Sequence, residues 1–137
     1  MDKRLLFLMN MAQRNMFNHA EKVCEQQLGF TLTQMAAVMF VNNNPGCMQK
    51  DVVQGLGLKK SAVTSLLSRI ESNGLIRRVV SEDDARVVNL FATEQGKDKS
   101  QLALPLIAEL NQQLTDGFNE EEIAVIARFL NQVRDRF

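Results

Sequence analysis

Apolar residues recur at helical spacing in the first third of the chain. Over residues 2–28 they fall close to every third or fourth position, which predicts one long amphipathic helix. A second helix is expected to begin at Thr31 or Thr33, and the pair of Thr31 and Gln34 is typical of a capping box. Three asparagines followed by proline and glycine, at 42–46, predict the end of that helix.

The middle of the chain carries shorter patterns. Helices are predicted at 48–54 and 60–72, separated by a tight turn of alternating glycine and leucine at 55–58. Two runs of β-branched and apolar residues follow, at 75–80 and 87–91, and each has the length and composition of a strand. Because they are close in sequence, they are expected to form a hairpin.

Two further helices complete the pattern. The first is predicted at 94–117 with Thr93 as its N-cap, and Pro105 inside it is expected to bend or break it. The second is predicted at 119–137 and starts from a capping box at Asn119. Four helices, a hairpin and two helices therefore predict a mainly α fold with a small β-hairpin.

This order is the plan of a winged helix-turn-helix, in which two helices joined by a glycine-containing turn precede a β-hairpin, the wing. We assign the winged lobe to residues 31–96 of a single domain, 1–137. The flanking segments, 1–28 and 97–137, carry more apolar surface than so small a lobe can cover. Exposed apolar stripes imply a partner, and a two-fold homodimer is the commonest solution, so both segments are predicted to be dimerisation helices.

The second helix of the motif has two different faces. Four apolar residues at helical spacing are expected to be buried: Val63, Leu66, Leu67 and Ile70. The other face carries small, mostly hydroxylated side chains and one arginine: Ser61, Ala62, Thr64, Ser65, Ser68, Arg69 and Ser72. Small side chains let a helix enter the major groove, where hydroxyls contact phosphates and base edges. The alternative is a serine-rich exposed face that binds nothing.

The distribution of charge favours the same helix. The chain has 16 basic and 16 acidic residues, so its net charge is zero. Residues 58–78 nevertheless carry five bases and one acid, whereas residues 101–127 carry five acids and no base. A local excess of positive charge is typical of a surface that meets an anion, and double-stranded DNA is the expected partner.

The turn between the two strands combines acids with one arginine. Residues 81–85 are largely acidic, and DNA would repel them, but Arg86 follows directly. An arginine held by the carboxylate of Asp84 would be oriented to enter the minor groove. The alternative is a local ion pair that only stiffens the turn.

Residues 51–96 resemble the recognition region of MarR-type transcription regulators. The resemblance rests on residues 51–58 and 61–78, on Asp84-Ala85-Arg86, on Leu90 and on Thr93-Glu94-Gln95-Gly96. The order of the helices and the length of the chain are also similar to those of the family. Three positions depart from the family pattern: Lys59 replaces a capping Asp or Ser, Ser65 stands where many members have a basic residue, and Phe91-Ala92 stands where a leucine often precedes the threonine.

The resemblance implies a homodimeric repressor that binds an inverted-repeat operator and is released by a small aromatic effector. It also implies that the hydroxylated face lies in or beside the major groove and that Arg86 is the wing-tip arginine, supported by Asp84. The candidate DNA-binding residues are Lys59, Lys60, Ser61, Thr64, Ser65, Arg69, Arg77 and Arg86.

An effector pocket and a reactive thiol are the remaining candidate sites. Methionine suits an adaptable pocket, so the candidate pocket residues are Met9, Met16, His19 and Met39. The pattern nevertheless favours a plastic core or dimer interface for the methionines and a structural or exposed role for the histidine. Cys24 lies on an apolar stripe and is expected to be buried and inert, which leaves Cys47 as the candidate redox thiol.

Other classes of function find little support. One histidine, two distant cysteines and no catalytic motif predict no enzyme, metal site or cofactor. Because no apolar run approaches the roughly 20 residues that cross a bilayer, the expected location is the cytoplasm, without membrane contact. Two rival hypotheses remain: a winged-helix protein-interaction module, which the acidic turn and Ser65 allow, and a thiol redox sensor.

Overall fold

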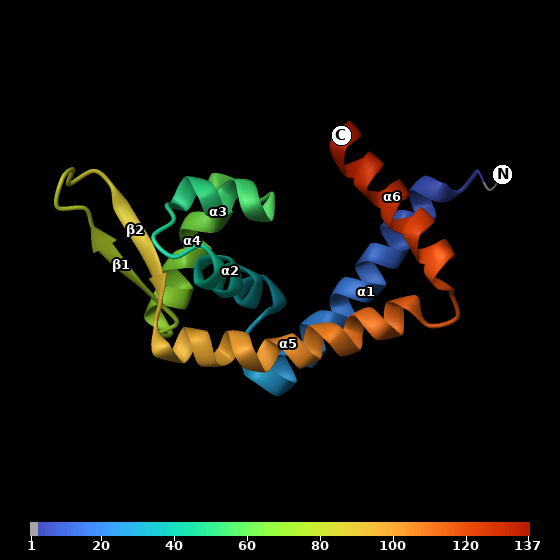
Figure 1. Cartoon of the computed structure of the whole chain (residues 1–137), viewed down its shortest axis with the longest axis horizontal. Coiled ribbons are helices and arrows are strands. Elements are labelled where there is room, and N and C mark those ends of the chain that lie inside the picture. Colours follow the sequence, from blue (N-terminus) through green and yellow to red (C-terminus); the bar gives the residue numbers. More distant parts are fainter. Residues whose placement is uncertain (1–2) are drawn as a thin grey trace. The chain divides into compact units, whose positions relative to one another are not determined.

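The computed structural model describes residues 3–137, so Asp2, where the first helix is expected to start, lies outside the described residues. The described chain contains six helices and two strands (Figure 1). The helices are α1 (Leu5–Leu28), α2 (Leu32–Asn43), α3 (Gln49–Leu56), α4 (Lys60–Ser72), α5 (Glu94–Thr115) and α6 (Glu120–Arg136). The strands are β1 (Ile76–Val80) and β2 (Val88–Ala92). The chain divides into two compact units, with the boundary between Leu104 and Pro105.

Local signals in the sequence determine most helix ends. Thr31 is the N-cap of α2, and both bonds of its capping box with Gln34 are present, at 3.0 and 3.1 Å. The capping box at Asn119 is likewise formed, and α6 starts at the next residue. Gly29 ends α1 in the left-handed conformation, with φ of 76°. The carboxylate of Glu21 on α1 also accepts a hydrogen bond from the Leu32 N–H, so α1 helps to cap α2.

The predicted tight turn after α3 is wrong in its first half. Gly55 and Leu56 still belong to the helix, and the left-handed residue that ends it is Gly57. Gly55 is needed for packing, because a Cβ atom at this position would collide with the ring of Phe40 on α2. The sequence alone does not show whether a glycine is needed for a turn or for close packing between two helices.

The core of the first unit lies between α2, α4 and the hairpin. On α4 the predicted stripe is confirmed, since Val63, Leu67 and Ile70 are fully buried and Leu66 is half-buried. Helix α4 packs against α2 and β1. Burying one such side chain stabilises the fold by about 1.5–3 kcal/mol, so this packing holds the outer face of α4 in place.

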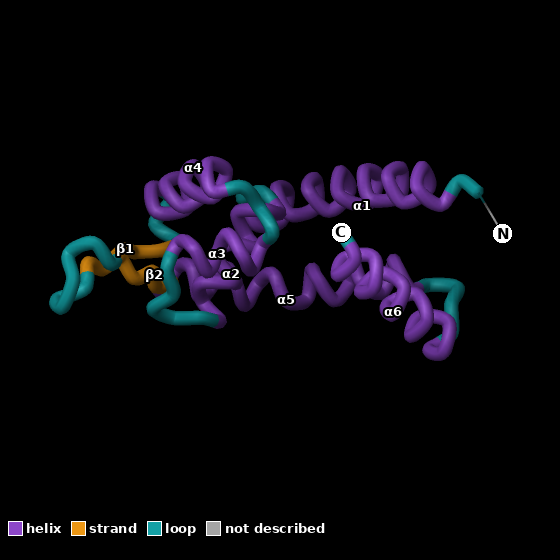
Figure 2. Tube along the Cα trace, turned by 90° about the horizontal axis from the view of Figure 1, so that it is seen from above, coloured by secondary structure: helices purple, strands orange, loops and turns teal. Residues whose placement is uncertain are grey.

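The two strands pair antiparallel, with Ile76 opposite Ala92 and Val80 opposite Val88. The loop that joins them projects beyond the helices of the first unit (Figure 2). A separate bridge between Cys47 and Leu90 attaches the hairpin to the segment before α3. The base of the wing is therefore anchored, whereas its tip is free to meet a ligand.

The terminal helices expose much apolar surface. The buried residues of α1 are confined to its C-terminal part, at Ala20, Cys24 and Leu28, and α6 has none. Of the bend or break expected at Pro105, the structure rules out the break, since α5 runs without interruption from Glu94 to Thr115. Pro105 lies at an exposed position, where solvent can satisfy the carbonyl that the missing N–H leaves without a partner.

Candidate nucleic-acid interface

The outer face of α4 is exposed throughout. All seven residues that were assigned to it by helical spacing are solvent-exposed. Part of the face is hollowed into a shallow cleft lined by Thr64, Ser65, Ser68, Arg69, Ser72 and Asn73. Because the opposite stripe is fixed in the core, α4 presents a row of small polar side chains on a rigid support, as base-edge contacts require.

Two lysines stand at the N-terminus of α4. Lys59 is the N-cap in extended conformation and makes no side-chain capping bond, as its departure from the family pattern predicts. The first N–H groups of the helix therefore lack a side-chain partner, and both Lys59 and Lys60 are exposed beside them. Backbone donors, the positive end of the helix dipole and two ammonium groups together favour a phosphate at this end.

Thr64 is tied to the preceding helix. Its Oγ1 donates to the Lys60 carbonyl at 3.0 Å and accepts a hydrogen bond from Nε2 of Gln49, on α3, at 2.7 Å. Gln49 is absent from the candidate residues chosen from the sequence. The two residues are 15 positions apart on different helices, and no periodic pattern relates them.

The wing tip carries a preformed pair of charges. The guanidinium of Arg86 donates from Nε to Oδ1 of Asp84 at 3.2 Å and from its terminal nitrogen to Oδ2 at 3.3 Å. The backbone N–H of Arg86 adds a third bond, at 2.9 Å. These bonds lower the pKa of the Asp84 carboxyl, the side chain of Arg86 making the largest contribution. The pair therefore stays ionised until the pH falls below the usual range of an aspartate.

The Arg86 side chain remains available in spite of this pair. Its relative exposure is 91%, which is the condition for reaching a groove. Because Asp84 holds the guanidinium on one side, the acidic turn orients the arginine and partly neutralises its own charge. This geometry is compatible with both hypotheses from the sequence: that Asp84 orients Arg86 toward a groove, and that the ion pair only stiffens the turn.

The structure separates Arg77 from the other candidates. Neighbouring residues of a strand point to opposite faces, and Arg77 stacks over the ring of Phe91, with 4.7 Å from the guanidinium carbon to the ring centroid. Arg78 is on the other face and pairs with Glu71 of α4, at 3.2 Å. Arg77 is exposed, but it lines a small cleft with Phe91 and Lys97 instead of joining the α4 face.

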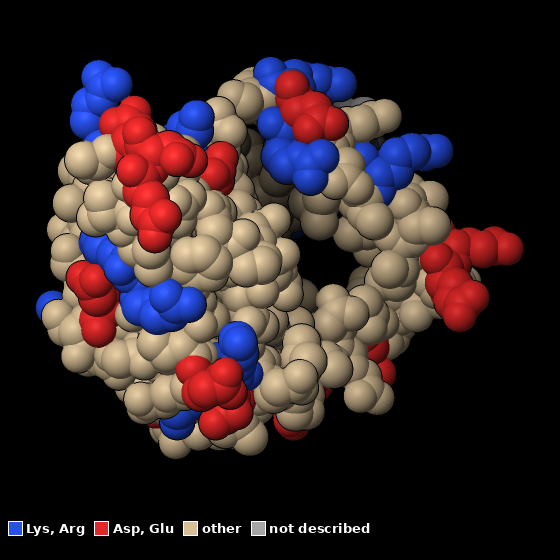
Figure 3. Space-filling model, turned by 60° about the vertical axis from the view of Figure 1, so that its left-hand side comes forward, with Lys and Arg blue, Asp and Glu red and all other residues tan. Residues whose placement is uncertain are grey.

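Figure 3 shows how the charged side chains are distributed over one face of the molecule. On the face drawn in Figure 3, basic and acidic side chains are interspersed and do not form one continuous basic area. With a net charge of zero as well, the chain offers a polyanion little overall attraction, so the local bases at α4 and the wing matter most.

A clamp of short contacts joins the wing to α5. Oγ1 of Thr93 donates to the Gly74 carbonyl at 2.6 Å and accepts from the Gly96 N–H at 3.0 Å, which confirms Thr93 as the N-cap of α5. The Thr93 N–H also donates to the Leu75 carbonyl at 3.1 Å. Gly96 is buried against that carbonyl, and a Cβ atom there would collide with its oxygen. The clamp explains why a threonine and a glycine stand three residues apart.

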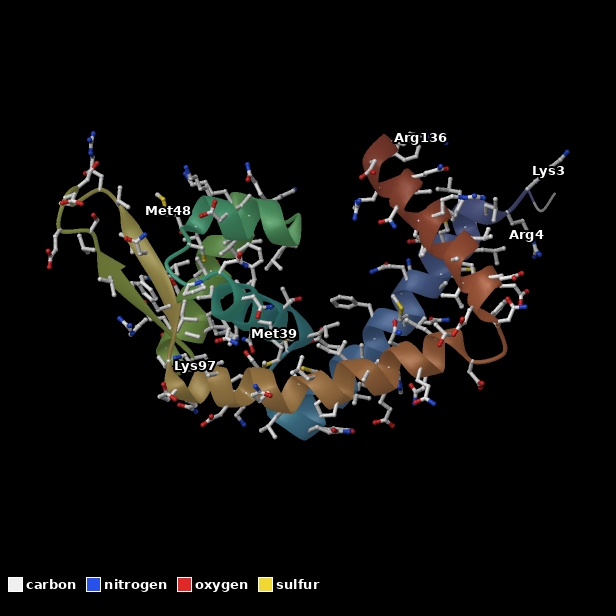
Figure 4. The ribbon with its side chains drawn as sticks, in the orientation of Figure 1. Lys3, Arg4, Met39, Met48, Lys97 and Arg136 are labelled. Atoms are coloured by element: carbon white, nitrogen blue, oxygen red, sulfur yellow. The ribbon has the colours of Figure 1, made fainter. Side chains whose placement is uncertain are left out.

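One of the four proposed pocket residues lines a cavity in the first unit. Met39, on the α5-facing side of α2 (Figure 4), borders a cavity of about 130 Å³. Its lining is Met39, Asn42, Asn43, Ser100, Gln101 and Leu104. Met9 is half-buried and Met16 and His19 are exposed, and none of these three lines this cavity. Ser100 is buried, and its hydroxyl has no hydrogen-bond partner among the described residues.

Neither thiol has the environment of a reactive cysteine. Cys24 is buried, as predicted, and burial raises its pKa, with Glu21 and Glu25 adding to the effect. Cys47, expected at the surface, is half-buried by its bridge to β2. Its pKa is also raised, first by burial and then by Asp51. Both shifts reduce the thiolate fraction on which redox reactivity depends.

The described residues contain no cluster of histidine, cysteine and carboxylate groups arranged to bind a metal ion. Among their helices, none combines the length and the apolar character needed to cross a bilayer.

Comparisons with known proteins agree with this geometry. A sequence model of the MarR family matches residues 28–87, which include α2, α3, α4 and β1. An uncharacterised helix-turn-helix transcriptional regulator of Bacillus subtilis, YybA, is 25% identical over 113 residues, corresponding to 80% of this chain and 73% of YybA.

Solved structures extend the likeness in fold over nearly the whole chain. The transcriptional regulator SlyA superposes with a TM-score of 0.89 at 23% identity. The superposition covers 96% of this chain and 92% of the SlyA chain. FabT of Streptococcus pneumoniae, solved in complex with DNA, has a TM-score of 0.82 at 25% identity, covering 97% and 94%. The sequence model, the curated relative and the shared fold agree. Residues 28–87 match the MarR family of winged helix-turn-helix transcription regulators, and nearly the whole chain shares the fold of such regulators.

Proposed function

We propose that the chain is a homodimeric, sequence-specific repressor that binds an inverted-repeat operator in the cytoplasm. The observation that carries this proposal is the exposed, hydroxylated face of α4 on the same lobe as an exposed arginine fixed at the wing tip. The face of α4 would enter the major groove, and Arg86 the adjacent minor groove. FabT, which shares the fold, was solved with DNA.

The exposed apolar surface of the terminal helices supports the proposed dimer, and an inverted-repeat operator would match it. An inverted repeat is read by two lobes related by a two-fold axis. The terminal helices expose large apolar side chains, which on α1 are Leu5, Leu6, Phe7, Leu8, Met11, Met16 and Phe17 and on α6 are Val125, Ile126, Phe129 and Leu130. We propose that these side chains are buried between two copies of the chain, since monomers rarely leave so many exposed.

Fluorescence anisotropy on duplex DNA from the region flanking the gene, repeated across salt concentrations, tests the function. We expect nanomolar, sequence-selective binding with two protomers for each site. If Lys59, Lys60 and Arg69 of both protomers meet phosphates and Arg86 enters the minor groove, affinity should fall by roughly 10³–10⁵-fold between about 50 and 200 mM salt, because counterions are released on binding.

A charge-neutralising variant sharpens this test. Lys60→Gln should weaken binding to every duplex alike and lower the slope of log affinity against log salt by about one for each protomer. Lys22→Gln, which removes another exposed lysine, from α1, is the matched control and should change neither quantity. Weak, sequence-blind binding by the wild type would contradict the proposal and favour the protein-interaction module.

The cavity beside Met39 supports an effector site. Its volume of about 130 Å³ is close to the roughly 150 Å³ of a cavity known to hold benzene. Apolar walls from Met39 and Leu104 combine with the amides of Asn42, Asn43 and Gln101. We propose that a single-ring aromatic compound with one hydrogen-bonding group binds there, satisfies the Ser100 hydroxyl and releases the operator.

The effector proposal is tested with phenol, benzoate and salicylate as probes of DNA release. Ser100→Ala should raise the concentration required for half-release by roughly 2- to 12-fold, the effect of losing one hydrogen bond. Asp98→Ala, at an exposed position of the same helix, is the control and should respond like the wild type. Release by none of the probes, or equal responses of wild type and Ser100→Ala, would contradict a site at this cavity.

A further inference from the structure

We infer that Gln49, at the start of α3, is a specificity-determining residue, and that together with Thr64 it favours an A·T pair at one position of each half-site. The inference rests on the proposed sequence-specific DNA binding and assigns part of the reading to a helix other than α4. It starts from one interhelical contact, the 2.7 Å hydrogen bond from Nε2 of Gln49 to Oγ1 of Thr64.

The contact fixes the orientation of the Gln49 amide. A threonine hydroxyl has a single proton, and Thr64 donates it to the Lys60 carbonyl at 3.0 Å. The bond to Gln49 therefore has to be donated by the amide NH₂ group, which turns Nε2 toward Thr64 and leaves Oε1 free of this bond. The Gln49 side chain is not needed to cap the N-terminus of α3, because the Asp51 carboxylate already accepts the Met48 N–H at 2.8 Å.

The same contact changes what Thr64 can offer to DNA. Its proton is committed within α4, so the hydroxyl cannot donate to a phosphate or to a base acceptor. What remains for contact is mainly the methyl group, which suits the methyl group of thymine. The polar atoms at this point of the face belong to Gln49: one N–H and the carbonyl oxygen of its amide.

Those two groups match adenine. An amide that donates to N7 and accepts from the N6 amino group recognises adenine in the major groove, and a methyl contact recognises thymine. Gln49 is half-buried and Thr64 is exposed, so the pair is supported on one side and open on the other. An amide held in one orientation discriminates between bases better than a mobile one, because the alternative hydrogen-bond pattern is excluded.

The test selects operators from a random duplex library with the full-length protein and then replaces each base pair of the selected half-site. For the wild type, replacing A·T by G·C at one position should weaken binding by roughly 5- to 150-fold. In Gln49→Ala this ratio should approach one, while the preferences at other positions and the unfolding temperature stay unchanged. Gln54→Ala removes an exposed glutamine from the same helix and should retain the full ratio.

A second variant tests the role of the pair. Thr64→Val keeps the shape of the side chain and removes the anchor, so Gln49→Ala should change affinity less in the Thr64→Val background than in the wild type. If Gln49→Ala lost affinity equally for all duplexes, Gln49 would contact a phosphate, and the inference that it reads a base would be overturned. An unchanged ratio of the affinities for A·T and G·C operators would overturn it as well. If the wild type selects no sequence at all, the proposed function fails, and this inference fails with it.

Discussion

Replacing Gly96 with alanine is expected to lower the free energy of unfolding by about 1–3 kcal/mol, the range found for overpacked cores. The added Cβ would collide with the Leu75 carbonyl oxygen, which is backbone and already accepts the Thr93 N–H. Relief would require the first turn of α5 to move away from the start of β1. Urea denaturation followed by circular dichroism measures the change.

The sign of this effect separates packing from helix propensity. Alanine is about 1 kcal/mol more favourable than glycine within a helix, so propensity alone predicts a more stable protein. Asp98→Ala, at an exposed position of the same helix, is the control and should leave stability nearly unchanged. A Gly96→Ala protein as stable as the wild type would mean that the clamp between Thr93 and the Gly74–Leu75 backbone yields easily.

Arg86→Ala is expected to weaken operator binding by roughly 5- to 150-fold while the oligomeric state and the unfolding temperature stay unchanged. The reason is that the arginine reaches beyond the wing with its side chain exposed, so its removal disturbs no packing. Arg86→Lys should recover part of the affinity, because lysine keeps the charge but lacks the planar fork that Asp84 orients. Anisotropy titrations of the three proteins on one operator provide the comparison.

Arg77→Ala is the matched control on the same hairpin. It removes an equal charge from the strand face that stacks on Phe91, away from the α4 face, and should leave affinity close to that of the wild type. Equal losses for Arg77→Ala and Arg86→Ala would mean that DNA responds to the net charge of the wing. Equal affinity of Arg86→Ala and wild type would rule out the wing contact.

Features that depend on neighbouring residues could be predicted from the sequence. The capping boxes at Thr31 and Asn119 are both formed, and the buried stripe of α4 follows from residues three and four apart. The two strands were placed to within one residue, because β-branched runs and the turn between them are local patterns. The family resemblance is likewise carried by short motifs, within residues 51–96.

Features that depend on contacts between elements could not be predicted. Gly55 lies in a sequence typical of a turn, yet it is a helical residue that packs closely against the ring of Phe40. The face on which Arg77 lies depends on the strand register, and a cluster of bases in the sequence does not show it. The contact of Gln49 with Thr64 could not be predicted, because the two residues lie on different helices. Which of the candidate pocket residues borders the cavity beside Ser100 is likewise not visible in the sequence, and the structure places Met39 there.

The pairing of Arg86 with Asp84 also has a thermodynamic consequence. A free arginine on a mobile loop samples many rotamers, and a ligand that immobilises it has to offset the lost conformational entropy. Here two side-chain bonds and one backbone bond restrict the arginine before any ligand arrives. Much of the ordering therefore takes place during folding, and binding at the wing tip is expected to show a smaller entropic penalty than an unpaired arginine would incur.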